Sequence, residues 1–160
     1  MCEYCGCRGV PPIAELMDEH MALIGQAHFV RQALGTGDHA AAMALLSGLI
    51  AHLERHVQRE EAGIFTALRT SGEFLDEVDA LEGEHRDLAA AVTALDPDSS
   101  DFAARVTHLL DDLEIHVERE DLGIFPVSVV TLGATGWAIV DQAHTASPSF
   151  LLDQSTTSPA

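Results

Sequence analysis

The sequence predicts an all-α protein, an up-down-up-down antiparallel four-helix bundle with a short C-terminal fifth helix. Strand-like alternation of apolar and polar residues is absent from the 160 residues. Instead, clusters of glycine, proline and serine divide the chain into four long stretches, in which apolar residues recur three or four positions apart. Four long helices joined by short connections pack as an antiparallel bundle.

The first two helices have clear start and stop signals. Pro11-Pro12 suits the first turn of a helix that we expect to end near Ala33, because Gly35-Thr-Gly37 follows. Asp38 can cap a second helix that reaches about Arg69.

The remaining elements follow from the same kind of punctuation. After the break at residues 71–72, a third helix is expected over residues 73–95. The run Asp96-Pro-Asp-Ser-Ser100 predicts a turn that also supplies capping side chains for a fourth helix, from about Asp101 into the late 120s. A short fifth helix is expected over residues 136–144.

These elements give one bundle domain, residues 12–146, between two flanking segments. Residues 1–11 form a Cys-rich N-terminal segment, and the Ser, Thr and Pro content of residues 147–160 predicts a disordered tail. The apolar stretch from Gly123 to Val140 contains Pro126, so we interpret it as a helix end, a turn and a further helix, not as a membrane span.

The charge balance excludes some partners. The chain has 26 acidic and 8 basic residues and a formal net charge of −18, which disfavours nucleic acid and an anionic membrane surface. The start of the sequence lacks the basic and apolar runs of a secretory signal, so a cytoplasmic location is expected. The sequence leaves the oligomeric state open.

The most informative feature is an internal repeat. Residues 53–65, LERHVQREEAGIF, recur as residues 113–125, LEIHVEREDLGIF, with nine of thirteen positions identical. Each copy contains His-x-x-x-Glu. Each copy also has an upstream counterpart, because residues 16–23 and 81–88 share a Leu, a Glu, a His and a second Leu at equivalent positions.

Helical spacing places six polar residues of this repeat on the inward, apolar faces of the bundle. Buried carboxylates are costly unless a cation neutralises them, so we expect bound metal. Imidazole and carboxylate donors suit iron, and a carboxylate from each of two helices can bridge two ions, although zinc or manganese could use the same donors. The six predicted metal ligands are His20, His56, Glu60, His85, His116 and Glu120.

The order His, His-x-x-x-Glu, His, His-x-x-x-Glu resembles that of the hemerythrin-like domains, which are non-haem di-iron four-helix bundles. The resemblance covers about Pro12 to His144. It implies two iron ions bridged by Glu60 and Glu120, joined by an oxo or hydroxo group, and no catalytic residue apart from the metal ligands. It also implies that the partner is dioxygen, peroxide or nitric oxide, in storage, sensing or detoxification.

Two departures from the family pattern leave alternatives open. The oxygen-carrying hemerythrins have a further histidine where this chain has Leu81, so redox reaction with peroxide becomes more plausible than reversible oxygen carriage. Their final His-x-x-x-x-Asp spacing is satisfied by His116 and Asp121, so Asp121 competes with Glu120 as a ligand. We favour Glu120 because it matches the first copy of the repeat.

His52 is a further candidate ligand, because it lies one turn before His56 on nearly the same face. Three classes of function therefore stay open: a binding or sensing module, a catalase- or peroxidase-like di-iron enzyme that consumes peroxide, and a bundle whose zinc has a structural or sensory role.

The N-terminal segment contains a second candidate site. Cys2, Cys5 and Cys7 are close enough in sequence to bind one zinc or iron ion or to act as a redox group, but they lack an obvious fourth ligand. A permanent disulfide is not expected in a reducing cytoplasm.

Overall fold

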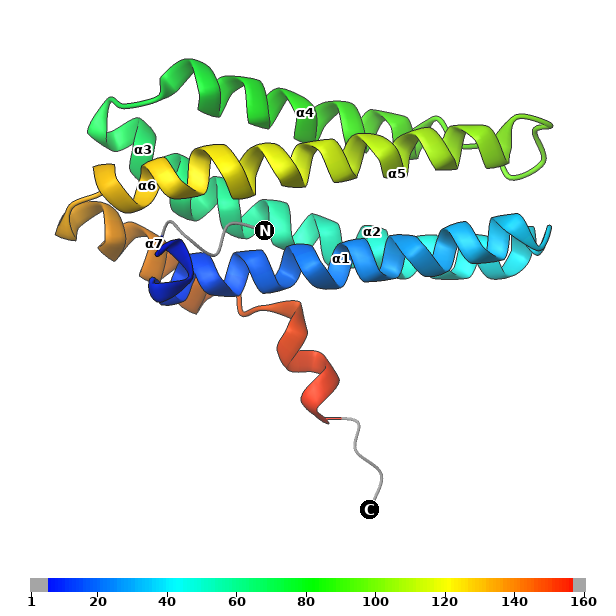
Figure 1. Cartoon of the computed structure of the whole chain (residues 1–160), viewed down its shortest axis with the longest axis horizontal. Coiled ribbons are helices and arrows are strands. Elements are labelled where there is room, and N and C mark those ends of the chain that lie inside the picture. The colour runs from blue at the N-terminus through cyan, green and yellow to red at the C-terminus, as the bar shows by residue number, and fades with distance from the viewer. Residues whose placement is uncertain (1–5, 157–160) are drawn as a thin grey trace.

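The computed structural model describes residues 6–156, whose long helices form an antiparallel four-helix bundle (Figure 1). Two long helices are regular: α1 (Pro11–Gly35) and α4 (Leu75–Thr93). The second long helix of the chain is a continuous run of α2 (His39–Glu60), η2 (Glu61–Phe65) and α3 (Thr66–Ser71). The fourth long helix is a continuous run of α5 (Phe102–Arg119), η3 (Glu120–Ile124) and α6 (Phe125–Thr131). The short elements are η1 (Cys7–Gly9), α7 (Ala134–Ala146) and η4 (Phe150–Thr156). No strand occurs among residues 6–156, so the predicted fold class is confirmed.

The boundaries of the first two long helices follow the predicted signals. Pro11 and Pro12 occupy the first turn of α1, where a missing backbone N–H costs nothing. Gly37 takes a left-handed conformation with φ 75°, which turns the chain after α1. The side chain of Asp38 then accepts a hydrogen bond of 2.9 Å from the backbone N–H of Ala41 and caps α2.

The second and fourth long helices each contain a π-helical turn, where the sequence predicted uninterrupted α-helix. In the first copy of the repeat, η2 begins one residue after the Glu of the His-x-x-x-Glu motif, and in the second copy η3 begins at that Glu. A π turn places one extra residue in each hydrogen-bonded turn and often occurs at functional sites. Here it carries Glu61 in the first copy, and Glu120 with Asp121 in the second.

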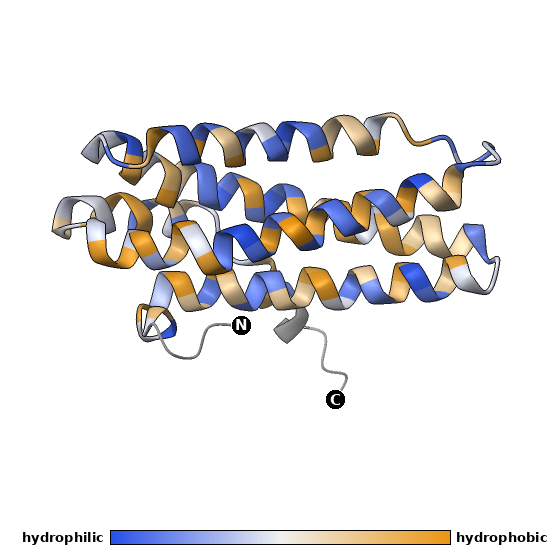
Figure 2. Cartoon of the chain, turned by 45° about the horizontal axis from the view of Figure 1, so that its top comes forward, coloured by the Kyte–Doolittle hydropathy of each residue, from blue (hydrophilic) through white to orange (hydrophobic). Residues whose placement is uncertain are grey.

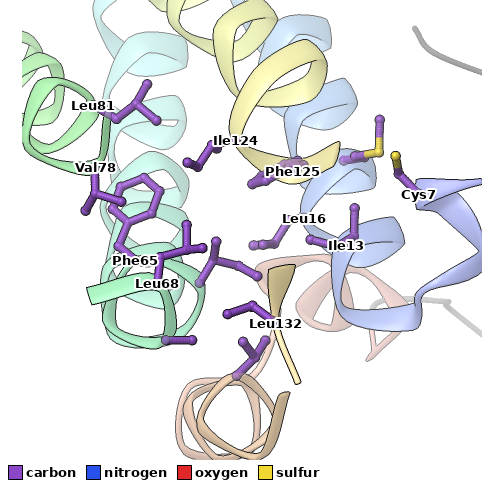
Figure 3. Close-up of a cluster of buried hydrophobic side chains, with 14 residues drawn as sticks. Cys7, Ile13, Leu16, Phe65, Leu68, Val78, Leu81, Ile124, Phe125 and Leu132 are labelled. Atoms are coloured by element: carbon purple, nitrogen blue, oxygen red, sulfur yellow. The ribbon is translucent and has the colours of Figure 1, made fainter. Parts of the chain in front are cut away.

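Two hydrophobic clusters fill the bundle, one toward the end where α3, α6 and α7 meet (Figure 3) and one toward the opposite end. Hydrophobic and hydrophilic residues alternate in short blocks along the long helices (Figure 2), as amphipathic packing requires. The cluster residues that flank the predicted ligands are Leu16 and Leu23 on α1, Leu53 and Ile64 on the second long helix, Leu81 and Leu88 on α4, and Leu113 and Ile124 on the fourth. The predicted ligands therefore form a polar layer between two apolar ones.

The fifth helix, α7, packs against η2, α3 and α1 at one end of the bundle (Figure 1). It approaches the bundle closely at Gly63, where an added Cβ would lie 3.5 Å from Cβ of Ala143. The segment after α7 is ordered where the sequence predicted a disordered tail: η4 forms, and buried Phe150 stacks on His52 with ring centroids 4.5 Å apart. Residues 157–160 lie outside the described part of the chain.

The N-terminal segment enters the fold through Cys7. Its side chain is buried in the hydrophobic cluster next to Ile13 (Figure 3), and it is disulfide-bonded, contrary to the expectation of reduced thiols. Cys2 and Cys5 lie outside the described residues. The apolar stretch from Gly123 to Val140 is divided between α6 and α7, and none of the helices described is long and apolar enough to cross a membrane.

Candidate metal centre

Six buried side chains converge in the polar layer, one histidine from each long helix and one glutamate from each of the second and fourth. Their ligand atoms form two overlapping groups, and within each group all atoms lie within 4.8 Å of one another. One group contains His20 and His56, the other contains His85 and His116, and both contain Glu60 and Glu120. Two groups that share two carboxylates are consistent with a dinuclear metal site.

His20 and His85 lie between the two shared glutamates. Nε2 of His20 is 3.5 Å from Oε1 of Glu60 and 3.2 Å from Oε2 of Glu120. Nε2 of His85 is 3.5 Å from Oε2 of Glu60 and 3.7 Å from Oε1 of Glu120. Each of these histidines therefore reaches both carboxylates.

His56 and His116 each approach the glutamate four residues later in the same helix. The distances from Nε2 to the nearest carboxylate oxygen are 3.1 Å for His56 and 3.2 Å for His116. Nε2 of His116 also lies 2.9 Å from Nε2 of His85. All four Nε2 atoms thus face the middle of the bundle, where a shared cation could replace the contacts between them.

Each of the four histidines contacts a further carboxylate through Nδ1. A carboxylate at Nδ1 holds the proton on that nitrogen, which leaves Nε2 as the acceptor and orients the ring toward a metal. The four pairs, with their Nδ1 to oxygen distances, are His20 with Asp121 (2.9 Å), His56 with Glu19 (2.7 Å), His85 with Glu61 (2.9 Å) and His116 with Glu84 (2.8 Å).

The two halves of the centre are related by the sequence repeat. His20 stacks on Phe125 with ring centroids 5.4 Å apart, and His85 stacks on Phe65 at 5.7 Å. The two phenylalanines occupy equivalent repeat positions. The carboxylates at Nδ1 correspond in the same way, so the internal repeat of the sequence becomes a pseudo-two-fold arrangement of the site.

Buried charges stabilise one another across this layer. Burial by itself lowers the pKa of a histidine, but the nearby carboxylates of Glu120 and Glu60 outweigh it and raise the pKa of His85 to about 11. Burial raises the pKa of a carboxyl group, yet the charge of His56 and the close approach of His20 and His85 hold the pKa of Glu60 well below its ordinary value. The site therefore favours ionised carboxylates, which are the form that binds metal.

Unsatisfied polar atoms show that a cation fits this site. Nε2 of His20, Nε2 of His56 and both carboxylate oxygens of Glu60 and Glu120 are buried without a hydrogen-bond partner. Buried polar atoms are ordinarily paired, and such a set at one point calls for an ion or another bound group. The donors are oxygen and imidazole nitrogen, the ligand types of non-haem iron, zinc and manganese.

Glu120 and Asp121, the two alternatives for one metal ligand, lie on different sides of the His20 ring. Glu120 lies in both ligand groups, whereas Asp121 contacts Nδ1 of His20 on the outer side of the ring.

His52 belongs to neither group; its Nδ1 lies 2.9 Å from Oε1 of Gln26, and its ring faces the C-terminal segment. Leu81, which stands where the oxygen-carrying hemerythrins have a further histidine, is buried in the hydrophobic cluster.

Glu19 and Glu84 belong to the site, although the sequence analysis gave them no role. The signal was present, because both copies of the upstream motif read Glu-His. Arg59 was also missed: it is buried and forms an ion pair with Glu19. Its equivalent in the second copy, Arg119, forms an ion pair with Glu84.

The fold and the site define a helical-bundle protein with a buried His/Glu cluster suited to metal binding. The model of the hemerythrin HHE cation binding domain family matches residues 11–128, and the chain belongs to this family. The match spans all four long helices and the six converging side chains. No curated protein and no solved structure matches the chain.

Proposed function

We propose that this chain is a non-haem di-iron protein that binds or reacts with dioxygen, peroxide or nitric oxide, and so serves in sensing, storage or detoxification. The observation that supports this most directly is the pair of four-residue ligand groups that share Glu60 and Glu120. Bound iron would supply one-electron oxidation and reduction together with a coordination position for a small ligand.

The residues of the chain prepare this site in two ways. The four carboxylates at Nδ1 fix the histidine rings and increase the basicity of Nε2. The hydrophobic clusters on either side of the polar layer limit the entry of bulk water, which leaves the site accessible to small uncharged molecules more than to hydrated ions.

The size and lining of a neighbouring pocket also favour a small ligand. His85 lines a pocket of about 180 Å³, whose walls include Leu53, Val57, Leu88 and Val92. A pocket of this size and apolar lining suits a diatomic molecule or peroxide better than a metabolite of ordinary size.

The test is to load the protein with ferrous iron without oxygen and then add dioxygen, nitric oxide or peroxide in separate experiments. A stable spectral change with no turnover supports a binding or sensing module. Sustained peroxide consumption that is lost in His56→Ala supports the enzyme alternative. A protein that takes up zinc but no iron contradicts the proposal and supports a non-redox metal.

A further inference from the structure

The two halves of the centre have matching ligands but differently covered surroundings. On the His20 and His56 side, the carboxylates at Nδ1 are Asp121, 17% exposed, and Glu19, 0% exposed. On the His85 and His116 side, the equivalent carboxylates are Glu61, 41% exposed, and Glu84, 30% exposed. The two halves therefore have equivalent ligands, but the carboxylates at Nδ1 are more exposed to solvent on the His85 and His116 side.

A buried arginine accounts for much of this difference. Arg59 is 0% exposed and lies 3.4 Å from Glu19, the carboxylate that holds His56. Its guanidinium also pairs with Glu15 and donates to the backbone oxygen of Ser147 at 3.1 Å, and it lies 3.0 Å from Nδ1 of His144.

Glu15 and Glu19 belong to α1, whereas His144 belongs to α7 and Ser147 follows it. Together with buried Ser149, these residues cover the His56 side of the centre.

Within residues 6–156, the other half has no comparable cover. Arg119, the repeat equivalent of Arg59, is 47% exposed where it pairs with Glu84. His116 lines a surface pocket of about 280 Å³ together with Glu84, Asp87 and Asp112. Because Glu84 is paired with Arg119, the carboxylates of Asp87 and Asp112 are the ones that make this opening more favourable to cations than to anions.

We propose that the two metal positions are inequivalent: the position at His20 and His56 retains its metal, and the position at His85 and His116 exchanges its metal with solution. Glu19 and Arg59 act as positioning residues for the retained metal. This inference rests on the proposed dinuclear centre and adds an order of loading and release to it.

The physical reason is the cost of freeing a ligand. A metal leaves when its histidines rotate away or take up a proton, and either step disturbs the carboxylate at Nδ1. Moving His56 breaks contacts of a buried ion pair, whose separated charges have no water to solvate them. Moving His116 disturbs a partly exposed pair, which water solvates readily.

The experiment loads the full chain with Co²⁺, adds excess EDTA, and follows metal loss by Co²⁺ absorbance and by elemental analysis of samples taken over time. We expect two phases of one ion each, with rates that differ by roughly 10-fold or more. His116→Ala should retain one ion that leaves at the slow rate, and His56→Ala should retain one ion that leaves at the fast rate.

A second matched pair preserves the test if a ligand variant does not fold. Glu19→Gln should accelerate the slow phase alone, and Glu84→Gln should accelerate the fast phase alone. Loss of both ions in one phase, or the opposite assignment of the rates, would overturn the inference while leaving the dinuclear centre intact. If the wild-type chain binds no metal, the proposed function itself fails.

Discussion

Nδ1 of His20 and Oδ1 of Asp121 are 2.9 Å apart although the two residues are separated by 101 positions in the sequence. This contact links α1 with η3, and it places Asp121 on the side of the His20 ring that faces away from the metal centre. Glu120, its neighbour, faces the other side of the ring, where Nε2 lies 3.2 Å away.

The first prediction separates these two acids. Asp121→Asn should keep two metals per chain and weaken their binding by roughly 10- to 100-fold, because the substitution removes the anionic partner of a ligand. Glu120→Gln should lose at least one metal, because it alters a group shared by both positions. Metal titration followed by elemental analysis measures both effects. Loss of metal from Asp121→Asn but not from Glu120→Gln would reverse the assignment.

The second prediction concerns stability and uses the repeat as its own control. Arg59→Ala should lower the free energy of unfolding by about 3–5 kcal/mol, because it removes the buried arginine that pairs with Glu19 and leaves that buried carboxylate with His56 as its remaining ion-pair partner. Arg119→Ala should cost about 0–1 kcal/mol, because that pair is partly solvated. Urea unfolding of the two metal-free variants against the wild type measures the difference. Equal costs would show that the burial of Arg59 contributes little.

The third prediction is a release of protons when metal binds at pH 7. The nearby carboxylates of Glu120 and Glu60 outweigh burial and raise the pKa of His85 to about 11, so metal-free His85 carries a proton at pH 7 that it must lose when its Nε2 binds a metal. In the metal-free protein this raised pKa gives stability that is complete below about pH 6.5 and is lost as the pH rises through about 11.

Proton release can be measured with a pH indicator in weakly buffered solution during metal addition. The wild type should release at least one proton per chain, and the exposed His108 provides the control, since His108→Ala should leave the release unchanged. Full metal uptake without proton release would contradict the prediction. The same competition means that metal affinity should fall as the pH is lowered.

The fourth prediction tests the exclusion of His52 from the centre. His52→Ala should keep the full metal content and lower the free energy of unfolding by about 1 kcal/mol, because it removes a hydrogen bond with Gln26 and the stacking on Phe150. His56 lies one turn further along α2 and belongs to a ligand group, so His56→Ala should lower the metal content. Metal content and thermal unfolding of the two variants decide the matter, and metal loss from His52→Ala would show that His52 is a ligand.

Much of the fold was accessible from the sequence because its signals are local. Pro11, Pro12 and Asp38 act within one helical turn of their own positions. The first two long helices, α1 and the run from α2 through α3, end close to the predicted residues. The convergence of the six side chains was also predictable, because an internal repeat with His and Glu on apolar faces can satisfy those groups only in the interior.

The remaining features depend on contacts between distant segments. Phe150 is ordered because it stacks on His52, and Arg59 is buried because α7 and the segment after it cover it. Neither contact has a signal near either residue in the sequence. The π turns η2 and η3 were missed for a different reason, because their residues fit a regular α-helix equally well by spacing and composition.

The most direct test of the di-iron proposal is the metal content of the full chain, purified without chelator and then supplied with ferrous iron in the absence of oxygen. Elemental analysis should give two irons per chain for the wild type and fewer for Glu60→Ala, which removes a carboxylate common to both ligand groups. Zinc alone, with no iron taken up under these conditions, would contradict the di-iron centre.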